Sequence, residues 1–136
     1  MVEIAIAILR LPDGRIVLQR RDQEAPIFAG MLGFFGGHAE PEDADSKQTI
    51  IRELGEETSL DIDTSSLHYI NSFEYAADVG KGLKQYKFFV YELTIIAENF
   101  DVYEGVGSEV YTRSEVLARD DITISARYTL EKLVKE

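Results

Sequence analysis

One segment, from Gly36 to Leu60, limits what this chain can fold into more than any other. It opens with two glycines and then gathers acids onto a stretch whose apolar residues have helical spacing. In a helix, Glu53, Glu56 and Glu57 share one narrow face, because successive residues turn by about 100°. The adjoining face is apolar and suited to packing on a core; it consists of Ile50, Ile51 and Leu54. We therefore predict an amphipathic helix whose acidic side stands beside a glycine turn.

Folding alone does not explain the acidic face of this helix. Like charges three or four residues apart each cost about 0.2–0.5 kcal/mol in an exposed helix, and more where water is partly excluded. A hard divalent cation offsets that repulsion, since Mg²⁺ takes carboxylate oxygens and keeps positions for water and substrate phosphates. Clustered carboxylates beside a glycine turn therefore indicate phosphate chemistry with Mg²⁺, or alternatively Mn²⁺, as the cofactor.

The same segment resembles the Nudix box, whose pattern is Gly-x5-Glu-x7-Arg-Glu-U-x-Glu-Glu-x-Gly-U, with U a bulky aliphatic residue. The second half of that pattern is matched from Arg52 to Glu57, and Leu60 closes it. With Gly37 as the first glycine, the isolated Glu of the pattern falls on Asp43, and eight residues rather than seven separate it from Arg52. Near the end of the helix, Ser59 replaces the glycine of the pattern, so we expect backbone strain or a different helix end there.

Nudix enzymes use water and a divalent metal to cleave a phosphoanhydride in a nucleoside diphosphate linked to another group. The resemblance implies that this chain does the same. It implies Glu56 and Glu57 as principal metal ligands, with Glu53 as a third ligand or the general base and the Gly36 carbonyl as a further oxygen donor. Arg52 is expected to hold a glutamate in place.

The family also recruits a general base from a loop beyond the box. The acidic loop from residue 98 to 107 makes Glu104 the best-placed candidate, ahead of Glu98 and Glu109. For each of these acids, simple solvation is the alternative interpretation.

Four further residues are predicted to bind substrate. Gly37 and His38 follow directly on the glycine turn, where phosphates are expected, although His38 could instead bond to backbone. Arg20 stands at the end of a predicted strand that lies near substrate in the family, with a solvated strand end as the alternative. Phe73 could stack on a nucleobase or belong to the core, as could Phe28, Phe34 and Tyr75.

The rest of the chain predicts a sheet covered by helices on both faces. The stretch 2–9 is apolar on both faces, and residues 15–21 return after the Leu11-Pro12-Asp13-Gly14 turn, which predicts a hairpin. The stretches 67–75 and 85–96 are also strand-like and apolar on both faces, and 109–111 reads as a short strand. Ser114 is a candidate N-cap of a short helix, and Thr123 or Ser125 of the last one. The fold class is therefore α/β (α+β), a Nudix-type α/β/α sandwich with a mixed β-sheet.

Composition restricts the partners. The 136 residues fit a single domain, 1–136, and the formal net charge of −11 argues against polymeric nucleic acid. With no cysteine there is no disulfide framework, and the apolar opening stretch is too short for a membrane span. We expect a cytoplasmic monomer or homodimer whose partner is a small-molecule nucleotide.

Substrate choice stays open at this stage. The compact length favours a small MutT-like enzyme that converts a nucleoside triphosphate to a nucleoside monophosphate and pyrophosphate. The alternatives are hydrolysis of a nucleotide sugar, ADP-ribose or a dinucleoside polyphosphate, or a Nudix-fold protein that binds a nucleotide without cleaving it. The altered box supports the last of these, whereas the three glutamates oppose it.

Overall fold

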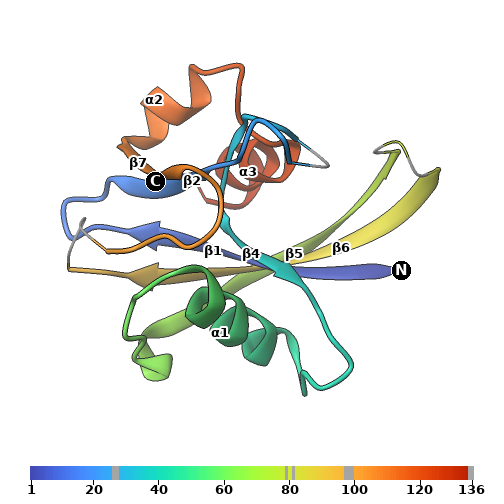
Figure 1. Cartoon of the computed structure of the whole chain (residues 1–136), viewed down its shortest axis with the longest axis horizontal. Coiled ribbons are helices and arrows are strands. Elements are labelled where there is room, and N and C mark those ends of the chain that lie inside the picture. Colours follow the sequence, from blue (N-terminus) through green and yellow to red (C-terminus); the bar gives the residue numbers. More distant parts are fainter. Residues whose placement is uncertain (26–27, 79, 81, 97–99, 135–136) are drawn as a thin grey trace.

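The computed structural model describes residues 1–25, 28–78, 80, 82–96 and 100–134. A mixed sheet lies between α1 on one face and the C-terminal helices on the other (Figure 1), which confirms the predicted α/β/α sandwich. The strands are β1 Val2–Arg10, β2 Ile16–Arg20, β3 Leu32–Gly33, β4 Phe35–His38, β5 Leu67–Asp78, β6 Leu83–Thr94 and β7 Gly107–Tyr111. The helical elements are α1 Ser46–Glu57, α2 Arg113–Leu117, α3 Ile124–Tyr128, the 3₁₀ turn η1 Thr64–Ser66 and the π-helical η2 Thr129–Leu133.

The strand β1 organises the sheet. It pairs in parallel with β6 along its whole length, and on its other side it pairs antiparallel with two strands in turn. Its first half meets β4, from Ile4 opposite His38 to Ala7 opposite Phe35, and its end meets β2. The predicted hairpin of the first two strands is therefore confirmed. The strand β2 also pairs with β3 and with β7. Both β2 and β4, the strand that carries the glycine pair, therefore lie beside β1.

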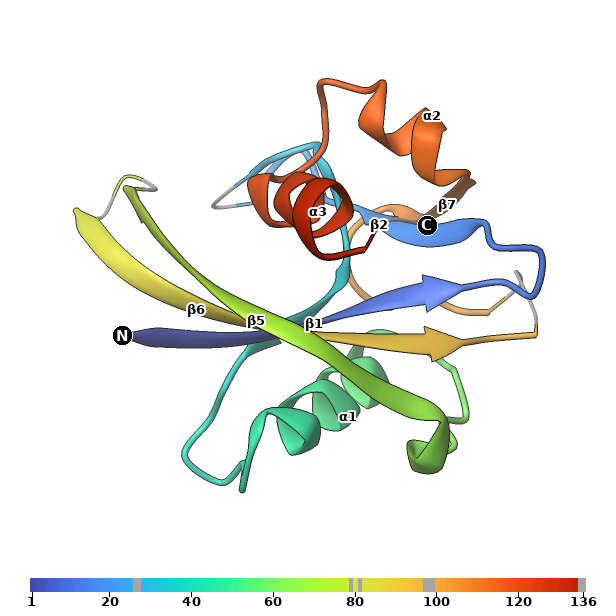
Figure 2. The ribbon, with the colours of Figure 1, turned by 180° about the vertical axis from the view of Figure 1, so that it is seen from behind.

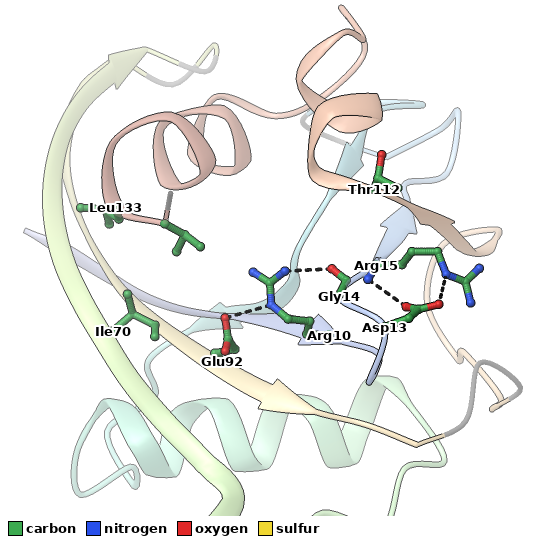
Figure 3. Close-up of a pocket in the computed structure, with 9 residues that line it drawn as sticks. Arg10, Asp13, Gly14, Arg15, Ile70, Glu92, Thr112 and Leu133 are labelled. Atoms are coloured by element: carbon green, nitrogen blue, oxygen red, sulfur yellow. Dashed lines mark hydrogen bonds and ion pairs between the residues drawn. The ribbon is translucent and has the colours of Figure 1, made fainter. Parts of the chain in front are cut away.

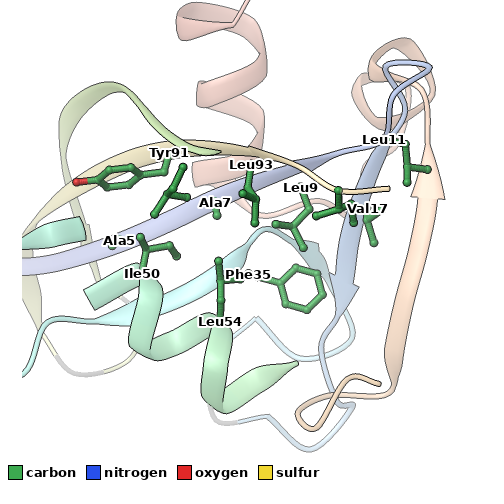
Figure 4. Packing of buried hydrophobic residues seen from close by; sticks show 12 residues of the cluster. Ala5, Ala7, Leu9, Leu11, Val17, Phe35, Ile50, Leu54, Tyr91 and Leu93 are labelled. Atoms are coloured by element: carbon green, nitrogen blue, oxygen red, sulfur yellow. The ribbon is translucent and has the colours of Figure 1, made fainter. Parts of the chain in front are cut away.

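Alternation along β1 creates a core on each side of the sheet. Ala5, Ala7 and Leu9 face α1, where they pack with the buried side chains of Ile50 and Leu54 (Figure 4). The intervening Ile6 and Ile8 belong to the second core, under α3 and α2. Seen from behind, α1 and the pair α2 and α3 again lie on opposite faces (Figure 2). The prediction of strands that are apolar on both faces is confirmed, and it explains why two helical layers are needed.

Two helix starts were predicted near the C-terminal end. The last helix begins as expected, with Thr123 as its N-cap. The start of α2 is a correction, because Thr112 rather than Ser114 is the N-cap. The Thr112 hydroxyl accepts from the Glu115 amide, and the Glu115 carboxylate accepts from the Thr112 amide, so a reciprocal capping box fixes this end. None of the helices within the described ranges is long and apolar enough to cross a membrane.

Candidate active site

The helix α1 sets the position of the acidic residues. Its start is capped by Asp45, whose carboxylate accepts from the Gln48 amide at 2.9 Å. Its apolar side, with Ile50 and Leu54 fully buried, fixes the rotation of the helix on the sheet. That rotation turns the side chain of Glu57 inward, where it is buried, while Glu56 stays exposed.

The guanidinium of Arg52 connects the acids to β4. It donates to Glu53 at 3.1 Å, to Glu56 at 3.0 Å and to the backbone carbonyl of His38 at 2.9 Å. It also donates twice to Asp43, at 3.1 and 3.0 Å, and this ion pair holds the pKa of Asp43 well below its usual range. Asp43, the residue at the position of the isolated Glu of the Nudix box, therefore still pairs with Arg52, although one more residue separates the two than in the pattern.

Glu57 is the most perturbed acid of the site. Burial, together with a hydrogen bond to the Glu104 carboxyl group, raises the pKa of Glu57 to about 9. One Glu57 oxygen accepts from the Gly36 amide at 3.1 Å, which favours its ionised form but does not outweigh the burial. The loop acid predicted from the sequence thus lies against the end of α1.

Both glycines after Phe35 are required by their surroundings. Gly36 has φ of +149°, and a Cβ there would collide with the backbone carbonyl oxygen of Ala5. A Cβ on Gly37 would stand 2.5 Å from the Glu53 carboxylate. The pair therefore lets β4 approach β1 on one side and leaves room for a carboxylate on the other.

Four carboxylates influence one another at this place. Burial raises the pKa of Glu53. The positive charge of Arg52 lowers this pKa, and the negative charges of Glu56 and Glu104 raise it. Glu53 and Glu104 in turn both raise the pKa of Glu57. A divalent cation would relieve this repulsion, so the acidic oxygen donors suit a hard cation such as Mg²⁺.

The described acids of the site do not form a closed set of metal ligands. Within the described ranges, no three acidic or histidine side chains are arranged as a ready metal cage. Mg²⁺ is usually held by one or two carboxylates together with water and substrate phosphates, so fewer than three protein carboxylates would suffice. The acids that could offer oxygens to a cation are Glu53 and Glu57, with Glu56 at the exposed rim and Glu104 beside Glu57.

The other base candidates differ from Glu104. Glu98 lies outside the described residues. Glu109 is held by Arg20 through two hydrogen bonds, at 2.7 and 2.9 Å, and this ion pair lowers the pKa of Glu109. An acid bound in this way is a poor proton acceptor, so the geometry favours Glu104 over Glu109.

Arg20, expected either to bind substrate or to form a solvated strand end, is paired within the protein. Besides Glu109, its guanidinium donates to Asp121 at 2.8 Å and to the Gly30 carbonyl at 2.9 Å. These contacts tie β2 to β7 and to the segment before α3, and they leave the side chain only 18% exposed. Its guanidinium is therefore engaged within the protein, and its part in substrate binding stays a prediction.

Phe73, expected either to stack on a nucleobase or to belong to the core, lies in the core. It is 7% exposed and stacks between Phe88, with ring centroids 5.0 Å apart, and Tyr128, at 4.3 Å. Tyr128 forms the outer side of the stack at 37% exposed. His38 is exposed at the end of β4 and offers its carbonyl to Arg52.

A separate cavity of about 660 Å³ is lined by other residues, among them Asp13 and Glu92 (Figure 3). Arg10 lines it and donates to Glu92 at 3.2 Å and to the Gly14 carbonyl at 2.9 Å. None of the predicted site residues is among the described residues that line this cavity. The candidate site is therefore the carboxylate cluster between α1, β4 and the loop with Glu104.

The fold and this cluster define a class of protein, the α/β/α sandwiches that present carboxylates beside a glycine turn. The NUDIX domain model matches residues 2–132. The chain therefore belongs to the Nudix family, and it is a Nudix hydrolase acting on phosphorus-containing anhydrides. Family membership confirms the resemblance inferred from residues 36–60.

Solved structures agree with the fold. The MutT protein from Methanosarcina mazei Go1 is 19% identical with a TM-score of 0.80, and the match covers 96% of this chain and 91% of that one. A MutT NUDIX hydrolase from Burkholderia pseudomallei is 21% identical with a TM-score of 0.77, covering 96% of both chains. The NUDIX domain of Shewanella oneidensis NrtR, complexed with ADP ribose, is 17% identical with a TM-score of 0.75, covering 96% of this chain and 84% of that one. No curated protein matches the chain.

Proposed function

We propose that this enzyme hydrolyses a nucleoside triphosphate to a nucleoside monophosphate and pyrophosphate. The observation that carries the proposal is the contact of the Glu57 and Glu104 carboxyl groups beside Glu53, at the glycine pair. Such a group of acids needs positive charge, and an anionic nucleotide can reach it only through a cation.

The proposed roles are those that the resemblance to the Nudix box implies. Glu53, Glu56 and Glu57 would hold Mg²⁺, or alternatively Mn²⁺, and the Gly36 carbonyl would add an oxygen. When bound, the cation would neutralise the diphosphate and lower the pKa of an attacking water. Gly37 and His38 would border the phosphates.

The proton of the attacking water needs an acceptor. Glu104 is our first choice, because it is exposed and meets Glu57 across the cluster; Glu53 is the second. Arg52 would hold Glu53 and Glu56 in orientation, as its hydrogen bonds to both indicate. Water adds to one phosphorus, the anhydride bond breaks, and pyrophosphate leaves with the electron pair.

The cellular location, oligomeric state and partner that we propose are those expected from the composition of the chain. We place the enzyme in the cytoplasm as a monomer or homodimer, with a free nucleotide rather than polymeric nucleic acid or a membrane as its partner. The net charge of −11 supports a substrate delivered with a cation.

Mass spectrometry of the products tests the proposal. The purified protein is incubated with Mg²⁺ or chelator against canonical and oxidised nucleoside triphosphates, nucleotide sugars, ADP-ribose and dinucleoside polyphosphates. We expect metal-dependent monophosphate plus pyrophosphate, lost in Glu57→Gln and kept in Glu74→Gln, an exposed acid on β5.

Other products would decide between the alternatives. Monophosphate plus a sugar phosphate would retain the chemistry and replace the substrate class. Nucleotide binding without any product would favour a binding protein, for which the altered box is the supporting observation.

A further inference from the structure

The loop that carries Glu104 is fastened to the end of α1. The Ser59 amide donates to the Asp101 carbonyl at 2.9 Å, and the Ser59 hydroxyl accepts from the Asp101 amide at 2.7 Å. Two residues further on, the Tyr103 amide donates to the Glu57 carbonyl at 2.7 Å. The segment after α1 and the loop thus run side by side, immediately before Glu104.

A second attachment comes from β2. Gln19 is only 6% exposed, and its side-chain amide donates to the Glu104 backbone carbonyl at 3.1 Å. The Val106 amide donates to the Arg20 carbonyl at 3.0 Å. Between them, Gly105 has φ of +71°, and a Cβ there would collide with that same Arg20 carbonyl oxygen. Glu104 is therefore held on both sides by backbone attachments.

Ser59 occupies the place where the Nudix box has glycine, and the structure shows what replaces the glycine conformation. The chain leaves α1 in extended form at Thr58, with φ of −138°. Within the described ranges, Phe28 is the only non-glycine residue with positive φ, so Ser59 is not strained. Of the two expected outcomes, strain or a different helix end, the structure has the different helix end, and the side chain that glycine lacks is the one that accepts from Asp101.

We propose that Ser59 and Gln19 are positioning residues that hold the 100–106 loop so that the Glu104 carboxylate faces Glu57. The proposal rests on the proposed function, because Glu104 matters only if the cluster is catalytic. The side chains of Ser59 and Gln19 are uncharged, and their hydrogen bonds go to the backbone of the loop rather than to a carboxylate. Their effect is on where the Glu104 backbone lies, and a misplacement of about 1 Å can lower turnover by about a hundredfold.

The test compares Ser59→Ala and Ser59→Gly with Ser59→Thr, which keeps the hydroxyl. We expect kcat to fall about tenfold in the first two, with KM within about twofold of wild type, and to recover in Ser59→Thr. Gln19→Met, which loses the donor, should behave like Ser59→Ala. Gln85→Ala, an exposed glutamine of β6, is the matched control and should retain activity.

A double-mutant cycle separates positioning from a general structural role. In the Glu104→Gln background, Ser59→Ala should cost no further activity in single-turnover assays, because the group it positions is gone. Equal losses in both backgrounds would overturn the proposal, as would unchanged kcat in Ser59→Ala and Gln19→Met.

Amide hydrogen exchange decides the matter independently of catalysis. In Ser59→Ala, the amides of Tyr103 and Val106 should exchange at least about tenfold faster, while those of β1 stay protected. If the wild-type protein hydrolyses nothing, the proposed function fails. Faster exchange in Ser59→Ala would still support the attachment of the 100–106 loop by Ser59. Unchanged exchange at both amides would refute it.

Discussion

Replacing Glu57 by Gln should change how the stability of the metal-free protein depends on pH. Burial, with the hydrogen bond to Glu104, raises the pKa of Glu57 from the ordinary 4.5 to about 9. Between these values the folded chain keeps the proton, whereas the unfolded chain loses it. The stabilisation is complete below the unfolded pKa and is lost as pH rises through the folded pKa.

The size of the effect follows from one proton. The free energy of unfolding should fall by about 1.4 kcal/mol per pH unit, or about 3 kcal/mol from pH 6 to 8. In Glu57→Gln the group cannot ionise, so this contribution to the slope should vanish. The variant should be more stable than wild type at pH 8 when no divalent cation is present.

Urea denaturation at pH 6, 7 and 8 in the presence of chelator measures this difference. Glu56→Gln is the matched control, because that side chain is 57% exposed and the same change of charge there should leave the slope near that of wild type. Identical slopes for wild type and Glu57→Gln would refute the assignment of a buried, proton-retaining carboxyl to Glu57. Mg²⁺ should restore wild-type stability at pH 8, since a cation that binds only the folded form stabilises it.

Three further changes test the scaffold of the site by urea denaturation. Arg52→Ala should lower the free energy of unfolding by about 1–3 kcal/mol, because it leaves several carboxylate oxygens without their donor. A loss below about 0.5 kcal/mol would contradict a stabilising role of these Arg52 hydrogen bonds. Gly36→Ala should cost at least about 1–3 kcal/mol, since φ is positive and the new Cβ meets the Ala5 carbonyl. Gly55→Ala is its control, an open helical position where the change should stabilise by about 0.5–1 kcal/mol. Leu54→Ala removes a fully buried side chain and should cost about 2–5 kcal/mol; a smaller cost would mean that α1 does not pack as described.

The local features of this fold were predictable from the sequence. Helical spacing predicts the acidic and apolar faces of α1, and Asp45, the N-cap that the structure shows, has a residue type preferred at that position. The turn at Gly14, where the amide donates to the Leu11 carbonyl at 2.9 Å, followed from turn chemistry. The capping box of α2 was also readable, since Thr112 and Glu115 have the required spacing, but the hydroxyl of Ser114 was preferred.

What could not be predicted depends on partners far away in the chain. Arg20 lies 89 residues before Glu109 and 101 before Asp121, so nothing near it announced that its charge was already paired. The roles of Gln19 and Ser59 were missed for the same reason. A signal did exist for Gln19, because an amide that continues the buried run Ile16–Leu18 needs a hydrogen-bond partner.

A titration with Mn²⁺, followed by electron paramagnetic resonance, tests most directly whether the carboxylate cluster is a cation site. We expect wild type and Glu74→Gln to bind at least one Mn²⁺ per chain, and Glu57→Gln to bind it at least about tenfold more weakly. No bound Mn²⁺ in the folded wild-type protein, or equal affinity in all three proteins, would contradict the account.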